Sequence, residues 1–424
     1  MKTILDRLRS MSTTNKQYNH MTHVPSLDDL EEFKNVSSNF FGLDSANRLE
    51  KTELMFTVKD IFNTYVFPTE MGSEIWKDFK AGNNARVISM ALNAGHYFIG
   101  KTVTSEFAVH NPTKTINPWD PNRQVGTSSS GSAVSVLLEE CDYSLCTQSG
   151  ASISRPSSYL GIYGVKPTFG LVPRTGILKT CDNFDTVGFM TNDISNANEI
   201  LSTISLTNNN HPQNNFIEDK DLKKCKVGYF DSEQIAQVVD SSSSMLSSYD
   251  RCISRLKEEG VNIEQISMPD FFHSIHLSHD IIYSKSLEYY FKNELKTMNE
   301  ISDSFKELIK QGSAWSPDRF KQERENQAAS IKAFDNFIEK SNIDYILTPA
   351  VHGVAPMIGK QEYNDLSLIW TYLQCPCITI PLDKCTEQNL PLGMNLSAKR
   401  FNDVNLINFV VKYFNKRPYH FSTS

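Results

Sequence analysis

The sequence lacks long apolar runs and any surplus of basic charge. No stretch approaches the roughly 18 to 20 consecutive apolar residues of a membrane-spanning helix, and the N-terminus has no apolar signal core. Its 42 Lys and Arg against 49 Asp and Glu give a net charge of -7. Because phosphate groups and anionic lipids are bound by clustered cations, we expect no direct contact with nucleic acid and no membrane association.

The eight cysteines lack the spacing of a disulfide framework, and a chain of 424 residues needs no covalent staples. We therefore expect reduced thiols in the cytoplasm; the basic, Ser- and Thr-containing segment 1–16 leaves a mitochondrial location as the alternative. Cys375, Cys377 and Cys385 could supply three metal ligands, but no CxxC pair or second ligand cluster accompanies them. No metal or other cofactor is predicted.

The texture of the chain changes near residue 50. Residues 1–50 predict an N-terminal helical or irregular arm without a chemical motif. Residues 51–424 alternate short apolar strands, Gly- and Ser-rich turns and helical patterns, which predicts a single α/β domain. Its architecture should be a mixed central β-sheet covered on both faces by helices.

Several elements are clearly marked within this domain. Apolar runs predict strands at 226–230 and 344–350, and a helical face at 246–256 ends before Gly260. Ser and Pro at 316–317 provide an N-cap and a first-turn proline for a long helix. The polar stretch 207–216 predicts a surface loop.

Residues 95–102, GHYFIGKT, match the GxxxxGK[ST] phosphate-loop pattern letter for letter. A phosphate loop needs a preceding strand and a loop whose amides converge on phosphate. Here residues 87–94 look helical and HYFI looks like the strand itself. We prefer an accidental match and keep nucleotide hydrolysis as an alternative.

Two segments rich in small residues carry the chemistry. GTSSSGSA at 126–133 runs directly into apolar VSVLL, which argues against a flexible linker. TQSGASISRP at 147–156 places Ser152 24 residues after Ser128. Small residues let backbone amides approach a ligand closely, as an oxyanion hole beside a nucleophilic serine requires.

These two segments, with TVKD at 57–60, GVKPTFGLVPRTG at 164–176 and DTVG at 185–188, occur in the order and spacing of the amidase signature family. The chain resembles this family over most of its length after residue 50. The resemblance implies the amidase signature fold, with catalytic motifs in 51–190, a variable region that shapes the substrate pocket in 191–345, and further sheet and helix elements in 346–424.

The resemblance also implies a role for individual residues. Lys59 matches the family's base, Ser128 the bridging serine that follows a cis peptide bond, and Ser152 the acylated nucleophile. The oxyanion-hole amides match Ser149, Gly150 and Ala151. Candidate residues of the substrate pocket are Thr127, Gln148, Arg155, Tyr283 and Trp370.

The sequence departs from the commonest pattern of the family near the nucleophile. Gln148 replaces an acidic residue, Ala151 replaces a glycine, and Arg155 follows Ser152 by three residues instead of two. We interpret these departures as subfamily differences. They leave the roles of Gln148 and Arg155 open.

The chemistry requires an uncharged lysine. A serine hydroxyl becomes an effective nucleophile when a positioned base accepts its proton, and a lysine with a usual pKa of about 10.4 must be desolvated to serve. Lys59 follows an apolar strand, which predicts burial, and Asp60 should point to the opposite face. For a lone lysine, a surface position at a strand end would be the alternative.

His273, His276 and His279 repeat at helical spacing and could bind a metal, although an ordinary helix face is preferred. Three functions remain open. The first is an amidase that cleaves a small or medium carboxamide through a Ser152 acyl-enzyme. The second is the glutaminase subunit of a tRNA-dependent amidotransferase, which passes ammonia to partner subunits, and the third is a catalytically silent subunit. A homodimer or amidotransferase partners are both compatible with the sequence.

Overall fold

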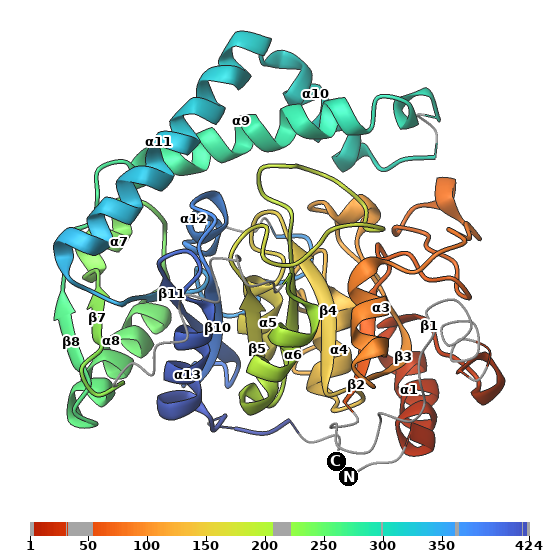
Figure 1. Cartoon of the computed structure of the whole chain (residues 1–424), viewed down its shortest axis with the longest axis horizontal. Helices are drawn as coiled ribbons and strands as arrows, with labels where there is room; N and C mark the ends of the chain where they lie inside the picture. Colours follow the sequence, from red (N-terminus) through yellow and green to blue (C-terminus); the bar gives the residue numbers. More distant parts are fainter. Residues whose placement is uncertain are drawn as a thin grey trace.

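A mixed β-sheet forms the centre of the molecule (Figure 1). The computed structural model describes residues 4–30, 32, 54–206, 222–297, 300–360, 364–417 and 419–421. Within these residues, eleven strands lie in the order β1-β3-β2-β4-β6-β5-β10-β11-β9-β7-β8. Their bounds are β1 (Met21–His23), β2 (Met55–Lys59), β3 (Tyr97–Thr102), β4 (Tyr143–Gln148), β5 (Tyr163–Lys166), β6 (Thr186–Thr191), β7 (Lys226–Tyr229), β8 (Asn262–Gln265), β9 (Tyr345–Pro349), β10 (Cys377–Lys384) and β11 (Pro391–Ala398).

The sheet combines parallel and antiparallel pairing. Strand β2 pairs in parallel with β3 and β4, and β7 pairs in parallel with β8 and β9. The strands between these two groups are antiparallel. Parallel neighbours need long crossovers, which the intervening helices provide.

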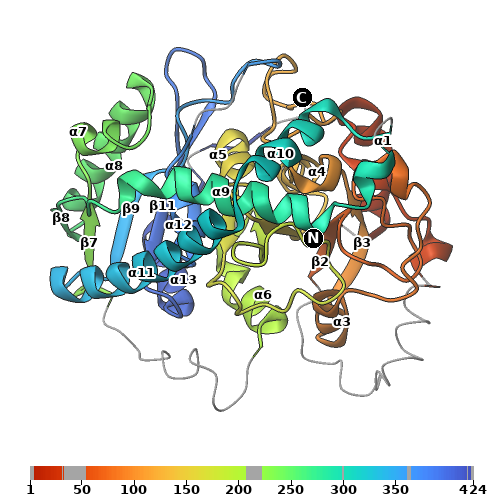
Figure 2. The ribbon, with the colours of Figure 1, turned by 90° about the horizontal axis from the view of Figure 1, so that it is seen from above.

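Helices cover both faces of this sheet. Figure 2 shows α4 and α5 on one side and α3, α6 and α13 on the other. This confirms the predicted fold class. The helices are α1 (Ile4–Tyr18), α3 (Arg86–Asn93), α4 (Ser130–Leu137), α5 (Ser154–Leu160), α6 (Ala197–Ile204), α7 (Ser232–Ala236), α8 (Ser243–Glu258), α9 (Phe272–Tyr290), α10 (Asp303–Ala314), α11 (Pro317–Ser341), α12 (Ser367–Tyr372) and α13 (Asp403–Phe414), and the short 3-10 helices are η2 (Glu74–Trp76), η3 (Glu106–Ala108), η4 (Ile194–Asn196) and η6 (Glu294–Thr297).

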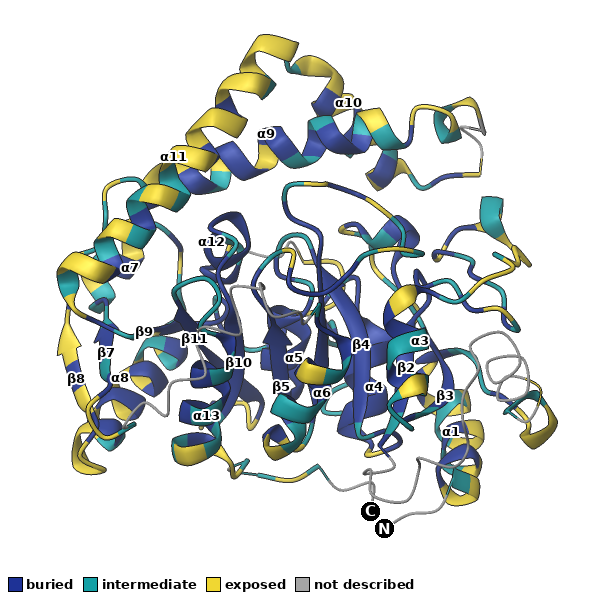
Figure 3. Cartoon of the chain, in the orientation of Figure 1, coloured by how far each residue is buried: buried dark blue, intermediate teal, exposed yellow. Residues whose placement is uncertain are grey.

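Helices α9, α10 and α11 lie together above one end of the sheet (Figure 1). Much of α11 is exposed, whereas Phe334 and Ile338 of this helix are buried (Figure 3). Helix α12 packs against α9, so this helical layer is joined to the sheet region. In the described part of the chain, no helix combines the length and apolarity needed to cross a bilayer.

Most of the marked elements appear where the sequence predicts them. Strands β7 and β9 and helix α8 match the predicted segments, and the Ser316 hydroxyl accepts the Arg319 N–H at 3.1 Å as the N-cap of α11. Residues 97–102 of the phosphate-loop pattern form β3, as expected for an accidental match. The segment 207–216 lies outside the described residues.

The N-terminal segment is joined to the sheet. Met11 of α1 is fully buried, and β1 pairs antiparallel with β3 at the edge of the sheet. Arg7 of α1 also donates to Asp142 at 2.6 Å. The described residues before position 33 therefore pack as part of the α/β fold instead of forming a separate arm.

Candidate active site

Lys59 stands at the end of β2 with its side chain fully buried. Its Nζ donates to Ser128 Oγ at 2.8 Å and to Ser129 Oγ at 3.2 Å. Both serines lie just before the start of α4, which packs against β2. The strand and the glycine- and serine-rich turn, far apart in sequence, thus bring an amine and two hydroxyl groups together.

Burial lowers the pKa of Lys59 from its ordinary value to about 7, although Cys146 and Asp185 oppose this change. Removing an ammonium group from water penalises its charged form. Asp60, the neighbouring residue, does not restore the charge, because its carboxylate pairs with Lys101 at 2.8 Å. A substantial fraction of Lys59 is therefore neutral near pH 7.

The turn after β4 presents its carbonyl groups to other parts of the chain. His279 Nε2 lies 2.8 Å from Ser149 O, and Thr371 Oγ1 donates to Gly150 O at 2.6 Å. The Arg155 amide donates to Ala151 O at 2.8 Å. In contrast, the amides of residues 149–151 donate to no acceptor within the described residues. These amides are therefore available to an external oxyanion.

Ser149 is held from a second direction by a buried carboxylate. Its hydroxyl donates to Asp185 Oδ1 at 2.5 Å. Asp185 also accepts hydrogen bonds from the amides of Thr180 and Cys181, at 2.7 and 3.0 Å. The start of the turn is thus anchored to the segment before β6.

A cavity of about 590 Å³ opens beside this turn. Ser152 is half-buried and lies on its wall, together with residues 149–151. Among the predicted pocket residues, Thr127, Arg155 and Tyr283 also line the cavity. The nucleophile candidate, the free amides and part of the predicted pocket therefore share one space.

Two predicted pocket residues lie elsewhere. Trp370 is fully buried among Phe272 and Phe334, and its Nε1 donates to Thr348 Oγ1 at 3.3 Å. Gln148 is fully buried behind the turn. Neither lines the cavity, so the structure corrects their prediction as pocket residues: Trp370 fills the core, and the Gln148 amide is used in backbone contacts.

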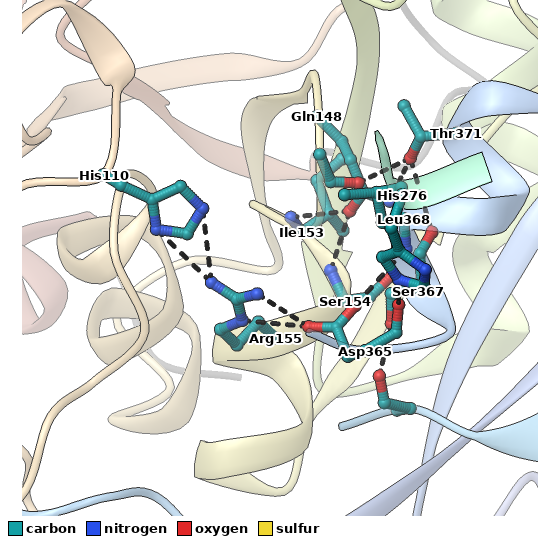
Figure 4. A network of polar contacts seen from close by, with 12 residues as sticks. His110, Gln148, Ile153, Ser154, Arg155, His276, Asp365, Ser367, Leu368 and Thr371 are labelled. Carbon is teal, nitrogen blue, oxygen red and sulfur yellow. Dashed lines mark hydrogen bonds and ion pairs between the residues drawn. The ribbon is translucent and has the colours of Figure 1, made fainter. Parts of the chain in front are cut away.

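Arg155 and Asp365 form a buried ion pair at the cavity (Figure 4). Arg155 donates to Asp365 Oδ2 from Nη2 at 2.8 Å and from Nε at 3.0 Å. The same guanidinium lies 3.5 Å from the ring nitrogens of His110. The sequence analysis missed Asp365, which belongs to no motif and reaches the site from 210 positions along the chain.

The geometry of this site agrees with the family to which the sequence is related. A family model described as Amidase matches residues 14–407. The chain belongs to the amidase family. As a member of this family, it is an enzyme that hydrolyses carbon–nitrogen bonds, which confirms the predicted class of reaction.

Two curated relatives of this amidase are both named as the same component of glutamyl-tRNA(Gln) amidotransferase, its first subunit. The protein from Sulfurihydrogenibium sp. (strain YO3AOP1) is 26% identical, and the match covers 94% of this chain and 90% of the relative. The protein from Prochlorococcus marinus (strain NATL2A) is 37% identical, but the match covers only 50% of this chain and 46% of the relative. In that second case the chain spans about half of the relative's length.

The fold of the amidase is also found in a solved structure, the native peptide amidase from Stenotrophomonas maltophilia. The TM-score is 0.80 at 18% sequence identity, and the match covers 99% of this chain and 95% of the other. At this identity the likeness concerns the fold.

The amidase differs in one respect from the expectation for Ser128. The described residues contain no cis peptide bond, so the bond before Ser128 is trans, and this prediction is wrong for the structure. The contact of Ser128 with Lys59 is made with this trans bond. Within the described part of the chain, Ser128 and Ser152 share no hydrogen bond.

The histidines of α9 in this amidase have different environments. His273 is exposed, whereas His276 Nε2 lies 3.0 Å from Asp365 O and His279 stacks on Phe184 with 4.4 Å between ring centroids. Burial lowers the pKa of His276. No group of three or more metal-ligating side chains occurs among the described residues. We therefore assign His276 and His279 to the support of neighbouring backbone.

Proposed function

We propose that this amidase is the glutaminase subunit of a tRNA-dependent amidotransferase, with Ser152 as its nucleophile. The observation that carries the catalytic part is the buried contact between Lys59 and Ser128, combined with a Lys59 pKa of about 7. The name of the Sulfurihydrogenibium relative, matched over 94% of this chain, supports glutamine as the substrate. It moves this function ahead of the stand-alone amidase that the sequence favours.

The proposed reaction begins with transfer of a proton. Neutral Lys59 accepts the Ser128 proton, and Ser128 takes the proton of Ser152 as the substrate moves the two hydroxyls into contact. The Ser152 oxygen then forms a bond with the amide carbon of glutamine. The proton held by Lys59 passes back to the amide nitrogen, the carbon–nitrogen bond breaks, and ammonia leaves.

Water completes the cycle by the same route. Ser128 and Lys59 accept a proton from water as its oxygen attacks the acyl carbon. The ester bond to Ser152 breaks, glutamate leaves, and the proton returns to the Ser152 oxygen. No group outside the chain is needed for this sequence of steps.

The turn before Ser152 supplies the electrostatic part of the proposal. Negative charge develops on the former carbonyl oxygen, and amides already aimed at that position stabilise it without reorganisation. The free amides of residues 149–151 support this role for Ser149, Gly150 and Ala151. Thr127, Arg155 and Tyr283 then contact the rest of the substrate from the cavity wall.

The proposal includes partners and a location. Ammonia released at Ser152 would pass to an amidotransferase partner subunit, which uses it on tRNA-bound glutamate. The acidic chain itself needs no contact with the tRNA, in keeping with its net charge of -7. All eight cysteines are free and buried, which supports a reducing compartment, the cytoplasm or the mitochondrial matrix.

The test is a panel of amides assayed for ammonia release. L-glutamine should be turned over by the wild type, and Ser152→Ala should reduce this turnover to background. A fluorophosphonate probe should label the wild type and not the variant.

The result also separates the alternatives. Turnover of simple aryl or aliphatic amides without any of glutamine would contradict the amidotransferase assignment in favour of a stand-alone amidase. A well-folded wild type that neither releases ammonia nor reacts with the probe would indicate the silent subunit.

A further inference from the structure

The turn that carries Ser152 is built from peptide planes whose orientation is set from outside. A trans peptide places its carbonyl and its N–H on opposite sides of one plane. A donor that holds the Gly150 carbonyl therefore also fixes the direction of the Ala151 N–H. That donor is Thr371 of α12, whose hydroxyl lies 2.6 Å from Gly150 O.

Thr371 is oriented in turn by Gln148 (Figure 4). Gln148 Oε1 accepts the amides of Ile153 and Ser154 at 2.8 and 2.9 Å. Because two N–H groups require an acceptor, this end of the side chain must be the oxygen, and Nε2 must face Thr371. The distance from Nε2 to Thr371 Oγ1 is 2.9 Å, and both side chains are buried.

The proton count gives this contact a direction. Gln148 Nε2 can only donate to the Thr371 hydroxyl, which leaves the single hydroxyl proton for another acceptor. Gly150 O accepts it at 2.6 Å, whereas the Ser367 carbonyl lies 3.4 Å away. The amide of Gln148 thus directs the Thr371 proton toward the turn.

We propose that Gln148 and Thr371 form a relay that aims the Ala151 N–H at the oxyanion of the reaction. Both are positioning residues, since neither lines the cavity that holds Ser152. The relay rests on the proposed function, because it assumes that Ser152 is the nucleophile. It assigns to Gln148 a role in the rate of acylation in place of contact with substrate.

Three variants test the relay. Thr371→Val keeps the shape of the side chain and removes its hydroxyl, and Thr371→Ser is the matched control that keeps the hydroxyl. Gln148→Glu keeps the acceptor of the two amides and removes the donor when ionised, so all assays are run at pH 8.5. Under those conditions the carboxylate accepts the Thr371 proton, and Gly150 O loses its donor.

The measurements are the rate of Ser152 labelling by a fluorophosphonate probe, and kcat and KM for L-glutamine. Loss of an oxyanion-hole donor costs about 100- to 1,000-fold in rate. We expect a misaimed donor to cost less, so Thr371→Val and Gln148→Glu should each lower the labelling rate and kcat by about 10- to 100-fold. KM should change by less than about 2-fold, because the interaction is made in the transition state.

Two further results are expected. Thr371→Ser should retain most of the wild-type rate. The double variant Gln148→Glu with Thr371→Val should be no slower than its slower parent, because both changes remove the same donor from Gly150 O.

The relay is wrong if folded Thr371→Val is labelled as fast as the wild type, or if Thr371→Ser is as slow as Thr371→Val. A lower melting temperature with unchanged kcat would reduce the two residues to a structural role and would also overturn it. Labelling that persists in Ser152→Ala is a different result, because it contradicts the proposed nucleophile.

Discussion

Two buried lysines on neighbouring strands of the sheet have opposite chemical roles. Lys59 ends β2, and Lys101 lies in the adjacent parallel strand β3, paired with Val58 in the register of the sheet. Both side chains are fully buried. Yet one is the base of the proposed reaction, and the other belongs to the phosphate-loop pattern that the structure shows to be a strand.

Their partners account for the difference. Lys101 Nζ contacts the Asp60 carboxylate at 2.8 Å, Thr69 Oγ1 at 2.8 Å and Pro68 O at 2.6 Å, so each ammonium proton has an acceptor. Burial lowers the pKa of both lysines, but Asp60 opposes this change at Lys101. Lys59 contacts hydroxyl groups instead of a carboxylate. Burial makes a lysine a base only where no carboxylate holds its proton.

The sharpest test of this comparison is Lys59→Met. Removing the base of a coupled catalytic group typically costs about 10,000-fold or more in kcat. We expect a loss of this order for glutamine hydrolysis, with little loss of stability because the variant buries a neutral side chain. Circular dichroism and thermal unfolding check the fold. A variant that retains turnover would show that another group accepts the proton.

The matched variant on the other strand is Lys101→Met. It leaves the Asp60 carboxylate buried without its cation, a change that typically costs about 3 to 5 kcal/mol of stability. We expect a large drop in the free energy of unfolding, measured in urea. The folded fraction should still react with a fluorophosphonate probe.

Changing both members of that pair provides the control. Asp60→Asn combined with Lys101→Met removes the unpaired charge, so much of the lost stability should return. If the double variant is no more stable than Lys101→Met, the ion pair is not the reason for the loss.

The rate of hydrolysis should depend on pH through Lys59. Its amine must be neutral to accept a proton, and its folded pKa lies at about 7. Below pH 7 the protonated fraction grows, so kcat/KM should fall by about tenfold per pH unit and should level off above about pH 8. A steady-state pH profile measures this. An inflection near the usual value for lysine, about 10.4, would mean that the amine is not desolvated in solution.

The smallest expected effect concerns the second hydroxyl at Lys59. Ser129 Oγ lies 3.2 Å from Nζ, farther than the 2.8 Å of Ser128. Ser129→Ala removes one ordinary hydrogen bond, worth about 0.5 to 1.5 kcal/mol, and should lower kcat by about 2- to 10-fold. Ser128→Ala should abolish turnover. Equal losses in the two variants would reassign the bridging role.

The sequence allowed the main chain of the site to be anticipated because its signals are local. Apolar strands and small-residue turns predict β2, β3 and β4 without reference to the rest of the chain. The side on which Asp60 lies follows from strand alternation, and its pairing with Lys101 agrees with that expectation. The motifs around Lys59 and Ser128 anticipated the contact between them.

The supports of the nucleophile turn could not be anticipated in this way. His279, Asp365 and Thr371 reach it from segments more than 100 residues away and belong to no motif of their own. Trp370 was misplaced for a related reason. An aromatic residue in a short apolar helix has the same local pattern whether its side chain enters the core or lines a cavity, and only packing decides.

The burial of all eight cysteines has a practical consequence. Thiol reagents need a solvent-accessible thiolate, so native protein should resist alkylation until it opens. One cysteine introduced at an exposed position, such as the 77% exposed Tyr289 near the end of α9, would then be the single reactive thiol of the native chain. A fluorophore could be attached there to follow the helical layer above the sheet without removing any natural residue of the core.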